Sequence, residues 1–244
     1  MKTDEVKDIY NTAIQKVFHG DYEHHRWFHS ALARADYDAT KRSIYFHVLD
    51  RKPTFHDYLE LGQGAGTWTA EFIAYNPRAS FDAVDISKEM IALAKEKLGE
   101  SARIRYFEGS FLDFDPDKKY DLFFSSRVIE YIPDVDAVVK KIASLLKPGG
   151  KGFIITKTPK YLRNKLLLRE TSGLHKGQIS PATLKNALEK NGFRDIAIYP
   201  VTMHFPLFRS AMINKLLYAI FYRCKLDPLS KFFAESYCVR FFKP

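Results

Sequence analysis

The architecture of this chain follows from residues 58–66, YLELGQGAG. The first half is a short apolar run typical of a buried strand, with Glu60 inside it. Gly62, Gly64 and Gly66 follow at alternate positions. Glycines between a strand and a helix let backbone N–H groups and the positive end of the helix approach a ligand, because side chains would block that approach. The stretch therefore predicts a strand that leads into a ligand-binding loop.

The rest of the chain alternates short β-rich runs with helical patterns from about residue 55 onward. Such alternation is typical of a parallel sheet covered by helices on both faces. The predicted strands cover residues 56–61, 80–85, 103–108, 120–125, 151–157, 193–200 and 236–242. We therefore predict an α/β fold with a Rossmann-like, doubly wound sheet of seven strands.

Capping residues mark where helices begin between these strands. Ser87 precedes an apolar stripe that ends at Gly99, and Asp134 opens a helix that ends in Pro148-Gly149-Gly150. Ser180 is followed by a proline at the first helical position. These three signals predict one helix after residue 87, one after residue 134 and one after residue 180.

Asp85 ends the second predicted strand, 19 residues after Gly66. A carboxylate at that place can accept hydrogen bonds from both hydroxyl groups of a ribose. Together with the glycine loop it predicts a cofactor that contains a nucleoside. The dinucleotide fingerprint GxGxxG would need glycine at position 67, where the chain has Thr67.

Five segments resemble, in order and spacing, the successive motifs of class I S-adenosylmethionine-dependent methyltransferases of the small-molecule type. They are LELGQGAGT, AVDISKEMIALAKEKL, YFEGSFLDFD, YDLFFSSRVIEYIPD and LLKPGGKGFIIT, and they cover about residues 56–157. The resemblance implies S-adenosyl-L-methionine as cofactor and S-adenosyl-L-homocysteine as product. It also implies a mostly parallel sheet in which the last strand, residues 236–242, runs antiparallel to the sixth.

The resemblance further implies which residues bind the cofactor. The corresponding positions are Glu60, Gly62, Gly64, Gly66, Asp85, Ile86, Ser110, Phe111 and Ser125. Glu60 and the glycines would hold the methionine end, and Asp85 would hold the ribose. Ile86 would cover one face of the adenine, residues 110–111 would contact its edge, and Ser125 would offer its carbonyl to the methionine amino group. Each position alone also fits a turn, a helix flank or the core, and the combination favours the cofactor.

Two residues are candidates for handling the methyl acceptor. His175 lies in a segment that resembles the family stretch where a histidine faces the pocket, so we predict it as the base for an oxygen acceptor; a structural histidine is the alternative. Arg127 departs from the small, apolar or acidic residues common at its family position. We predict that it binds an anionic group of the acceptor, against the alternative of a surface salt bridge to Glu130 or Asp134.

Positive charge is concentrated in the last third of the chain. Residues 1–157 hold 23 Lys+Arg and 24 Asp+Glu, whereas residues 158–244 hold 15 and 5. Segments 158–180 and 203–231, which do not fit the strand–helix alternation, each hold five Lys+Arg and one acid. We expect both on the active-site side, facing a hydrophobic acceptor that carries an anionic part and is small or linked to a lipid or a carrier. Segment 203–231 is a lid, an interfacial helix on anionic lipid, a homodimer contact or a helix packed on the domain.

We expect one methyltransferase domain over residues 1–244, because a chain of this length can bury a full core. Residues 1–55 would form an N-terminal helical cap, residues 56–157 the cofactor-binding core, and residues 158–180 and 203–231 insertions beside the active site. Two alternatives to a methyltransferase acting at an oxygen atom are a cofactor-binding scaffold without catalysis and a nucleic-acid methyltransferase. The nucleic-acid alternative lacks the Asn/Asp-Pro-Pro-aromatic signature after the fourth strand.

The chain is expected to work in the cytoplasm. Its N-terminal residues are charged where a secretory signal needs apolar ones, and no run approaches about 18 apolar residues. Cys224 and Cys238 are too few for a disulfide framework and lack metal-ligand spacing to histidines, so no metal site is predicted. Peripheral contact with the membrane stays open.

Overall fold

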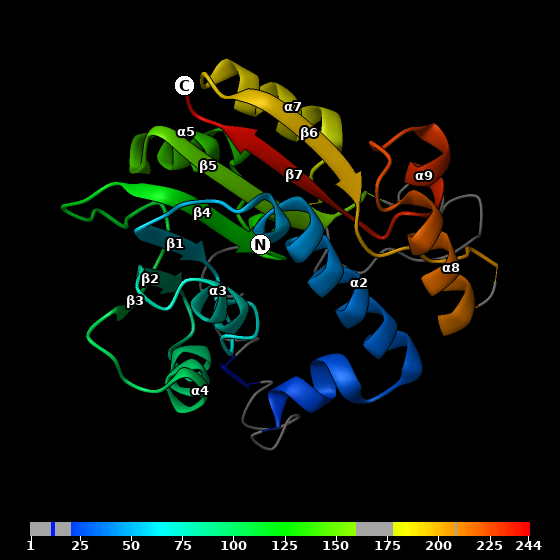
Figure 1. Ribbon diagram of the computed structural model, residues 1–244, viewed down its shortest axis with the longest axis horizontal. Coiled ribbons are helices and arrows are strands. Elements are labelled where there is room, and N and C mark those ends of the chain that lie inside the picture. Colours follow the sequence, from blue (N-terminus) through cyan, green and yellow to red (C-terminus); the bar gives the residue numbers. More distant parts are fainter. Residues whose placement is uncertain (1–10, 13–20, 160–177, 208) are drawn as a thin grey trace.

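A computed structural model of the 244-residue chain describes residues 11–12, 21–159, 178–207 and 209–244. Its centre is a seven-stranded sheet (Figure 1). The strands are β1 (Asp57–Leu61), β2 (Ser80–Asp85), β3 (Ile104–Glu108), β4 (Tyr120–Ser126), β5 (Leu146–Lys157), β6 (Arg194–Pro200) and β7 (Ser236–Phe242). Their order in the sheet is β3-β2-β1-β4-β5-β7-β6. β7 runs antiparallel to both of its neighbours and the other pairs are parallel, so the predicted fold class is confirmed.

Helices fill the connections, and three of them begin directly after Ser87, Asp134 and Ser180, as predicted. The helices are η1 (His24–Phe28), α2 (Ala31–His47), η2 (Leu49–Arg51), α3 (Thr69–Tyr75), α4 (Lys88–Leu98), η3 (Ile129–Tyr131), α5 (Val135–Leu145), α7 (Pro181–Lys190), α8 (Ala211–Phe221) and α9 (Pro228–Phe233). The caps work as expected. Ser87 Oγ accepts the Met90 N–H at 3.2 Å, and Asp134 Oδ1 accepts the Ala137 N–H at 2.9 Å.

One strand is longer than predicted. β5 begins at Leu146, five residues before the expected start. α5 ends at Leu145, and the Pro148-Gly149-Gly150 run lies in the strand instead of closing the helix. The strand starts early because its first residues form backbone hydrogen bonds with a residue far along the chain. Gly149 N–H donates to the Lys243 carbonyl at 2.8 Å, and the Lys243 N–H donates to the Gly150 carbonyl at 2.9 Å.

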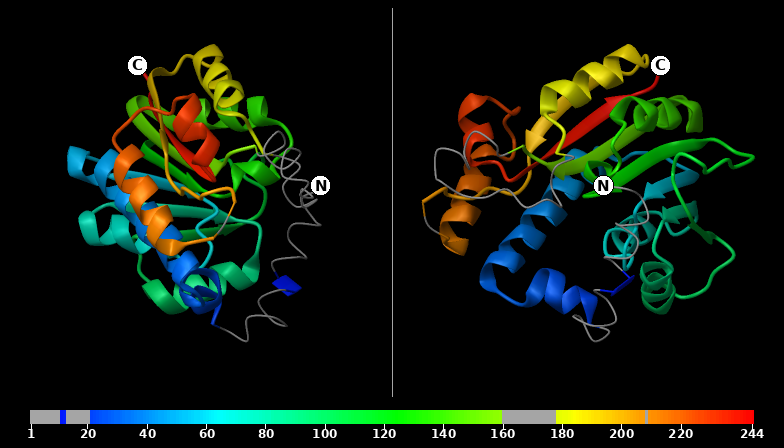
Figure 2. Two further views of the ribbon diagram at one scale, coloured as in Figure 1. Left: turned by 90° about the vertical axis from the view of Figure 1, so that its right-hand side faces the viewer. Right: turned by 180° about the vertical axis from the view of Figure 1, so that it is seen from behind.

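Alternation along the strands divides the core into two layers. Leu59 and Phe123 point into the layer beneath α5 and α7, whereas their chain neighbours Tyr58 and Phe124 point into the layer beneath α2 and α3. Side chains two residues apart share a face of a sheet, so both layers arise from the same short apolar runs. Figure 2 shows α2 and α5 on opposite sides of the sheet.

The topology gathers functional loops at one edge of the sheet. β6 is parallel to β5, because both are antiparallel to β7, and the chain leaves the carboxyl end of β6 to form α8 and α9. The glycine loop leaves the carboxyl end of β1, at the same edge (Figure 1). Ligands of open parallel sheets bind beyond this edge. Within the described part of the chain, no helix has the length and apolar character needed to cross a membrane.

Candidate functional site

The glycine loop after β1 is held to the next strand by the backbone. Gly62 N–H donates to the Val84 carbonyl at 2.7 Å, and its φ of 72° is in the left-handed region. A Cβ at Gly62 would lie 2.1 Å from Val128 Cγ2, so packing alone requires glycine there. Gly64, with φ of 54°, is different: the nearest atom to an added Cβ is Met90 Sδ at 4.0 Å. Gly64 thus keeps space open in front of the loop.

Replacing Gly64 by alanine should therefore weaken ligand binding more than it weakens the fold. The new methyl group would occupy the space in front of the loop, while the left-handed backbone costs about 1–2 kcal/mol of stability. Gly192→Ala is the matched control, since Gly192 has φ of 87° and nothing within 4 Å of an added Cβ. Both variants should lose similar thermal stability, and only Gly64→Ala should lose affinity for S-adenosylhomocysteine in calorimetry. Equal affinities would contradict a ligand in front of Gly64.

Asp85 closes the loop from the end of β2. Its Oδ2 accepts the Gly64 N–H at 3.1 Å, and its Oδ1 accepts the Ser87 N–H at 3.0 Å. Burial raises the pKa of this carboxyl to about 6, although the hydrogen bonds from Ser87, Gly64 and Ile86 act in the opposite direction. The loop and the acidic residue that the sequence pairs as a nucleoside site are therefore in direct contact.

The raised pKa of Asp85 predicts a pH-dependent affinity. Ribose hydroxyls donate to the ionised carboxylate, so binding should be strongest above pH 7 and weaken as the pH falls through about 6. At pH 5 about a tenth of the carboxyl is ionised, and the affinity for S-adenosylhomocysteine should be about tenfold lower than at pH 7. Titration calorimetry across this range measures the effect. In Asp85→Asn this step should disappear, and a step that persists there would assign it to another group.

A cavity of about 620 Å³ opens in front of the loop. The predicted residues that line it are Gly62, Gly64, Asp85, Ile86, Ser110, Phe111 and Arg127. Glu60, Gly66 and Ser125 are not among its lining residues. His175 lies outside the described residues. The structure thus brings seven of the predicted residues to one space.

The residues that do not reach the cavity support its walls. Glu60 is buried, its Oε2 accepts the Tyr58 and Thr69 hydroxyls at 2.9 and 2.8 Å, and burial raises its pKa to about 7. Ser125 is also buried, and its Oγ donates to the Leu61 carbonyl at 3.0 Å. A binding role for Glu60 or Ser125 stays a prediction. Ser126, the next residue, is the one that lines the cavity.

Buried polar atoms without partners gather around this cavity. Among the described residues they include the amide oxygen and nitrogen of Gln63, Ser126 Oγ, Arg127 Nε and Glu130 Oε1, all from residues that line it. Leaving such an atom unsatisfied costs about 1–3 kcal/mol, and proteins seldom keep several together without a reason. The arrangement fits a ligand with many polar groups.

Among the described residues, three cationic ones line the cavity: Arg26, Arg127 and Lys157. Arg127 follows β4 with φ of 63°, a left-handed conformation that is strained for arginine, and its N–H donates to the Ile155 carbonyl at 2.8 Å. Its Nη2 donates to Ser236 Oγ at 3.1 Å. Among the described residues no ion pair joins Arg127 to Glu130 or Asp134, and its guanidinium bonds to Thr202 and Ser236 instead. Burial lowers the pKa of Arg127.

Lys157 ends β5 at the same cavity. Burial and the nearby positive charge of Arg127 lower the pKa of its ammonium group to about 8. Glu130 Oε2 accepts the Lys157 N–H at 3.0 Å and the Thr156 hydroxyl at 2.6 Å, which places one carboxylate beside the cations. Sequence reasoning missed Arg26, Glu130 and Lys157. The position of Lys157 could have identified it as a site residue, because it ends a parallel strand just as Asp85 does.

Comparison with known proteins agrees with this geometry. Residues 59–151 match the family described as methyltransferase domain. A malonyl-[acyl-carrier protein] O-methyltransferase of Ilyobacter polytropus is 34% identical over 113 residues, which are 46% of this chain and 41% of that protein. The chain thus aligns with less than half of the length of this curated relative. A second such enzyme, from Priestia megaterium, is 34% identical over 92 residues, 38% of this chain and 33% of its own.

Solved structures share the fold across nearly the whole chain. Magnesium protoporphyrin IX methyltransferase from Synechocystis, solved with bound S-adenosylhomocysteine, has a TM-score of 0.64 at 15% identity and covers 100% of both chains. N-methyltransferase NodS from Bradyrhizobium japonicum, in complex with the same molecule, has a TM-score of 0.61 at 14% identity, with 96% of this chain and 98% of its own covered. Residues 59–151 therefore resemble a methyltransferase domain, and the chain shares the fold of these methyltransferases solved with bound S-adenosylhomocysteine.

Proposed function

We propose that the chain transfers a methyl group from S-adenosylmethionine to an oxygen atom of a carrier-linked or lipid-linked acceptor that has an anionic part. One observation carries the proposal: a single cavity is lined by Asp85 at the end of β2, by the glycine loop after β1, and by Arg127 and Lys157 at the ends of β4 and β5 on the other side of that loop. The side with Asp85 suits a nucleoside, and the side with Arg127 and Lys157 suits an anion.

The cofactor would lie along the glycine loop. Asp85 would accept the ribose hydroxyls, Ile86 and Phe111 would contact the adenine, and the unpartnered amide of Gln63 offers polar contacts along the loop. The cofactor supplies a methyl group on a positively charged sulfur. This chain's residues need to hold the acceptor oxygen in line with it, because alignment supplies much of the rate of such a displacement.

The cations would hold the acceptor. The curated relatives are named for a malonyl group on an acyl-carrier protein, and a malonyl group that is linked through one carboxyl keeps the other as a carboxylate. Arg127 and Lys157 suit such a group, since guanidinium and ammonium groups form charge-assisted hydrogen bonds with carboxylates. The acceptor oxygen forms the new O–CH₃ bond while the S–CH₃ bond breaks and its electron pair returns to sulfur.

The need for a base depends on the acceptor. A carboxylate oxygen carries no proton at neutral pH and needs no base, whereas a hydroxyl must lose its proton to a base. With a pKa of about 8, part of the Lys157 population is neutral near pH 7 and could accept that proton. His175 remains the second candidate from the sequence. Contact of residues 203–231 with a membrane belongs to the proposal as well, whereas contact with a second copy stays a prediction.

The purified chain incubated with S-adenosylmethionine and a cell extract tests the proposal. We expect release of S-adenosylhomocysteine that depends on the extract, and one extract component that gains a single methyl group by mass spectrometry. Asp85→Ala is the control for contaminating activity. Tight binding of S-adenosylhomocysteine without any transfer would favour the scaffold without catalysis, and methylation of added DNA or RNA would favour the nucleic-acid enzyme.

A further inference from the structure

Helices α8 and α9 present a group of exposed apolar side chains. Met212, Leu216 and Ile220 follow one another at four-residue spacing on α8 and are 78%, 60% and 55% exposed. Leu207, Leu229 and Phe232 extend the group onto the neighbouring loop and α9, and all three are exposed. These six side chains are called the α8–α9 surface below. The two helices are in contact, since the Phe221 and Phe233 ring centroids lie 6.4 Å apart, and exposed apolar side chains on neighbouring elements mark a contact with something else.

The α8–α9 surface is not needed to pack α8 on the domain, because the opposite face of the helix does that. Tyr218 is buried, and its hydroxyl lies 2.9 Å from Ser43 Oγ on α2. Leu217 and Phe221 pack around Tyr218 and its neighbours. Figures 1 and 2 show α8 lying along α2. The helix therefore has two apolar faces, and only the inner one has a partner among the described residues.

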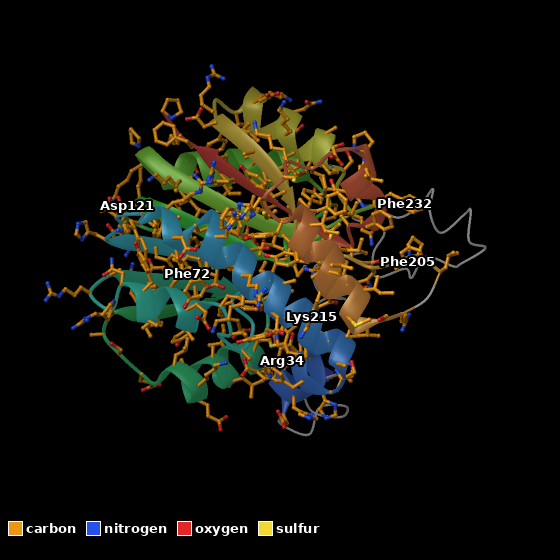
Figure 3. The ribbon with its side chains drawn as sticks, turned by 45° about the vertical axis from the view of Figure 1, so that its right-hand side comes forward. Arg34, Phe72, Asp121, Phe205, Lys215 and Phe232 are labelled. Carbon is orange, nitrogen blue, oxygen red and sulfur yellow. The ribbon has the colours of Figure 1, made fainter. Side chains whose placement is uncertain are left out.

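Basic residues flank the α8–α9 surface along the chain, and one of them, Lys215, forms an ion pair with Asp38 on α2 at 3.3 Å. The basic residues are Arg209, Lys215, Arg223, Lys225 and Lys231, all exposed, and Asp227 is the single acid in residues 203–231. Figure 3 turns this side forward and labels Lys215 on α8 and Phe232 on α9. An apolar stripe flanked by lysine and arginine suits the boundary between anionic headgroups and acyl chains. A second copy of the chain would bring like charges together, which disfavours a homodimer here.

The place of the surface agrees with the proposed reaction. α8 and α9 follow the carboxyl end of β6, and the cavity lies at the carboxyl ends of β1, β2, β4 and β5. Both therefore lie at one edge of the sheet (Figure 1). A lipid-linked acceptor held in a bilayer would meet the protein at this edge.

We propose that the α8–α9 surface inserts into the interface of an anionic lipid bilayer and presents the cavity to an acceptor anchored there. The choice of a lipid-linked acceptor rests on the proposed function, whereas membrane contact itself does not. Met212, Leu216 and Ile220 enter the acyl boundary, and the flanking basic residues lie among the headgroups. Binding is reversible and weakens with salt, because part of it is the attraction between exposed charges.

Vesicle sedimentation with the full chain tests the inference. Phosphatidylcholine vesicles that contain a quarter phosphatidylglycerol should bind the protein, and pure phosphatidylcholine should bind it at least about tenfold less. The double variant Met212→Glu/Leu216→Glu should lose at least about tenfold of the binding to anionic vesicles. Its matched control is Ala182→Glu/Asn186→Glu, which adds the same two charges at the same spacing on the exposed face of α7 and should bind like the unchanged protein.

Calorimetry with S-adenosylhomocysteine and circular dichroism keep the outcomes distinct. Both double variants should keep their fold and their affinity for S-adenosylhomocysteine. Anionic vesicles that do not bind the unchanged protein, or that bind Met212→Glu/Leu216→Glu equally well, overturn the inference. A dimer in analytical ultracentrifugation that this variant dissolves, without vesicle binding, assigns the surface to a second copy instead. If the unchanged protein does not bind S-adenosylhomocysteine, the proposed function is refuted. The inference about membrane contact would then still rest on the vesicle-binding result.

Discussion

Replacing Asp85 by alanine should weaken S-adenosylhomocysteine binding at least about tenfold, or about 1.4 kcal/mol, measured by titration calorimetry at pH 7.5. Two losses add up. The ribose hydroxyls lose a charged acceptor, and the N–H groups of Gly64 and Ser87 lose the oxygens that hold the loop at 3.1 and 3.0 Å. Hydrogen bonds to a charged group are among the strongest that proteins make.

Asp113→Ala is the matched control for this change. Asp113 is exposed and lies three residues after Ser110, so the variant removes a carboxylate near the cavity but not from its lining. It should bind S-adenosylhomocysteine like the unchanged protein. An unaltered affinity in Asp85→Ala itself would remove the central assignment of the nucleoside site.

Replacing Arg127 by asparagine should lower kcat/KM for the acceptor by about 100-fold, or about 3 kcal/mol, while the affinity for S-adenosylhomocysteine stays the same. Asparagine tolerates the left-handed backbone at this position, where φ is 63°, so the fold should survive the change. Under the proposed function, the change removes the guanidinium that would bind the anionic part of the acceptor. Steady-state kinetics with the acceptor identified from the extract measure this effect.

The companion variant Arg127→Lys separates charge from shape. It keeps the positive charge but loses the planar fork of donors that binds a carboxylate with two parallel hydrogen bonds. We expect activity between that of the unchanged protein and that of Arg127→Asn. Equal kcat/KM in all three proteins would show that Arg127 serves only its hydrogen bonds to Thr202 and Ser236.

These two replacements examine two parts of one cavity. Asp85 ends β2 and Arg127 follows β4, so the two residues lie on either side of the glycine loop that leaves β1. A loss of cofactor affinity in the first and of acceptor kinetics in the second would establish the division. Such a division explains how one fold serves many acceptors, since the cofactor site can stay constant while the acceptor site varies.

The nucleoside site could be predicted because its signals are local. A strand, a glycine loop and Asp85 nineteen residues later are close in sequence, and backbone geometry carries each of them into place. The parallel sheet then brings the ends of β1 and β2 together without further help. For the same reason the helix starts at Ser87, Asp134 and Ser180 were predictable, since a cap bonds to an N–H only three residues away.

The cationic residues could not be predicted in full, because they come from distant parts of the chain. Arg26 belongs to the N-terminal helices, Arg127 follows β4 and Lys157 ends β5. Nothing in the spacing of these three residues shows that they line one cavity. The early start of β5 is a similar case, because it depends on hydrogen bonds to Lys243 at the other end of the chain.

The sequence by itself therefore determined the order of strands and helices, the glycine loop, and Asp85 as its partner, because short-range hydrogen bonds and alternating apolar residues encode these features. Only the tertiary structure decided that Glu60 and Ser125 lie behind the cavity wall while Ser126 reaches the cavity, because adjacent residues of a strand point to opposite sides. It also decided which apolar face of α8 is covered by α2 and which stays exposed, since that depends on the partner a helix meets after folding.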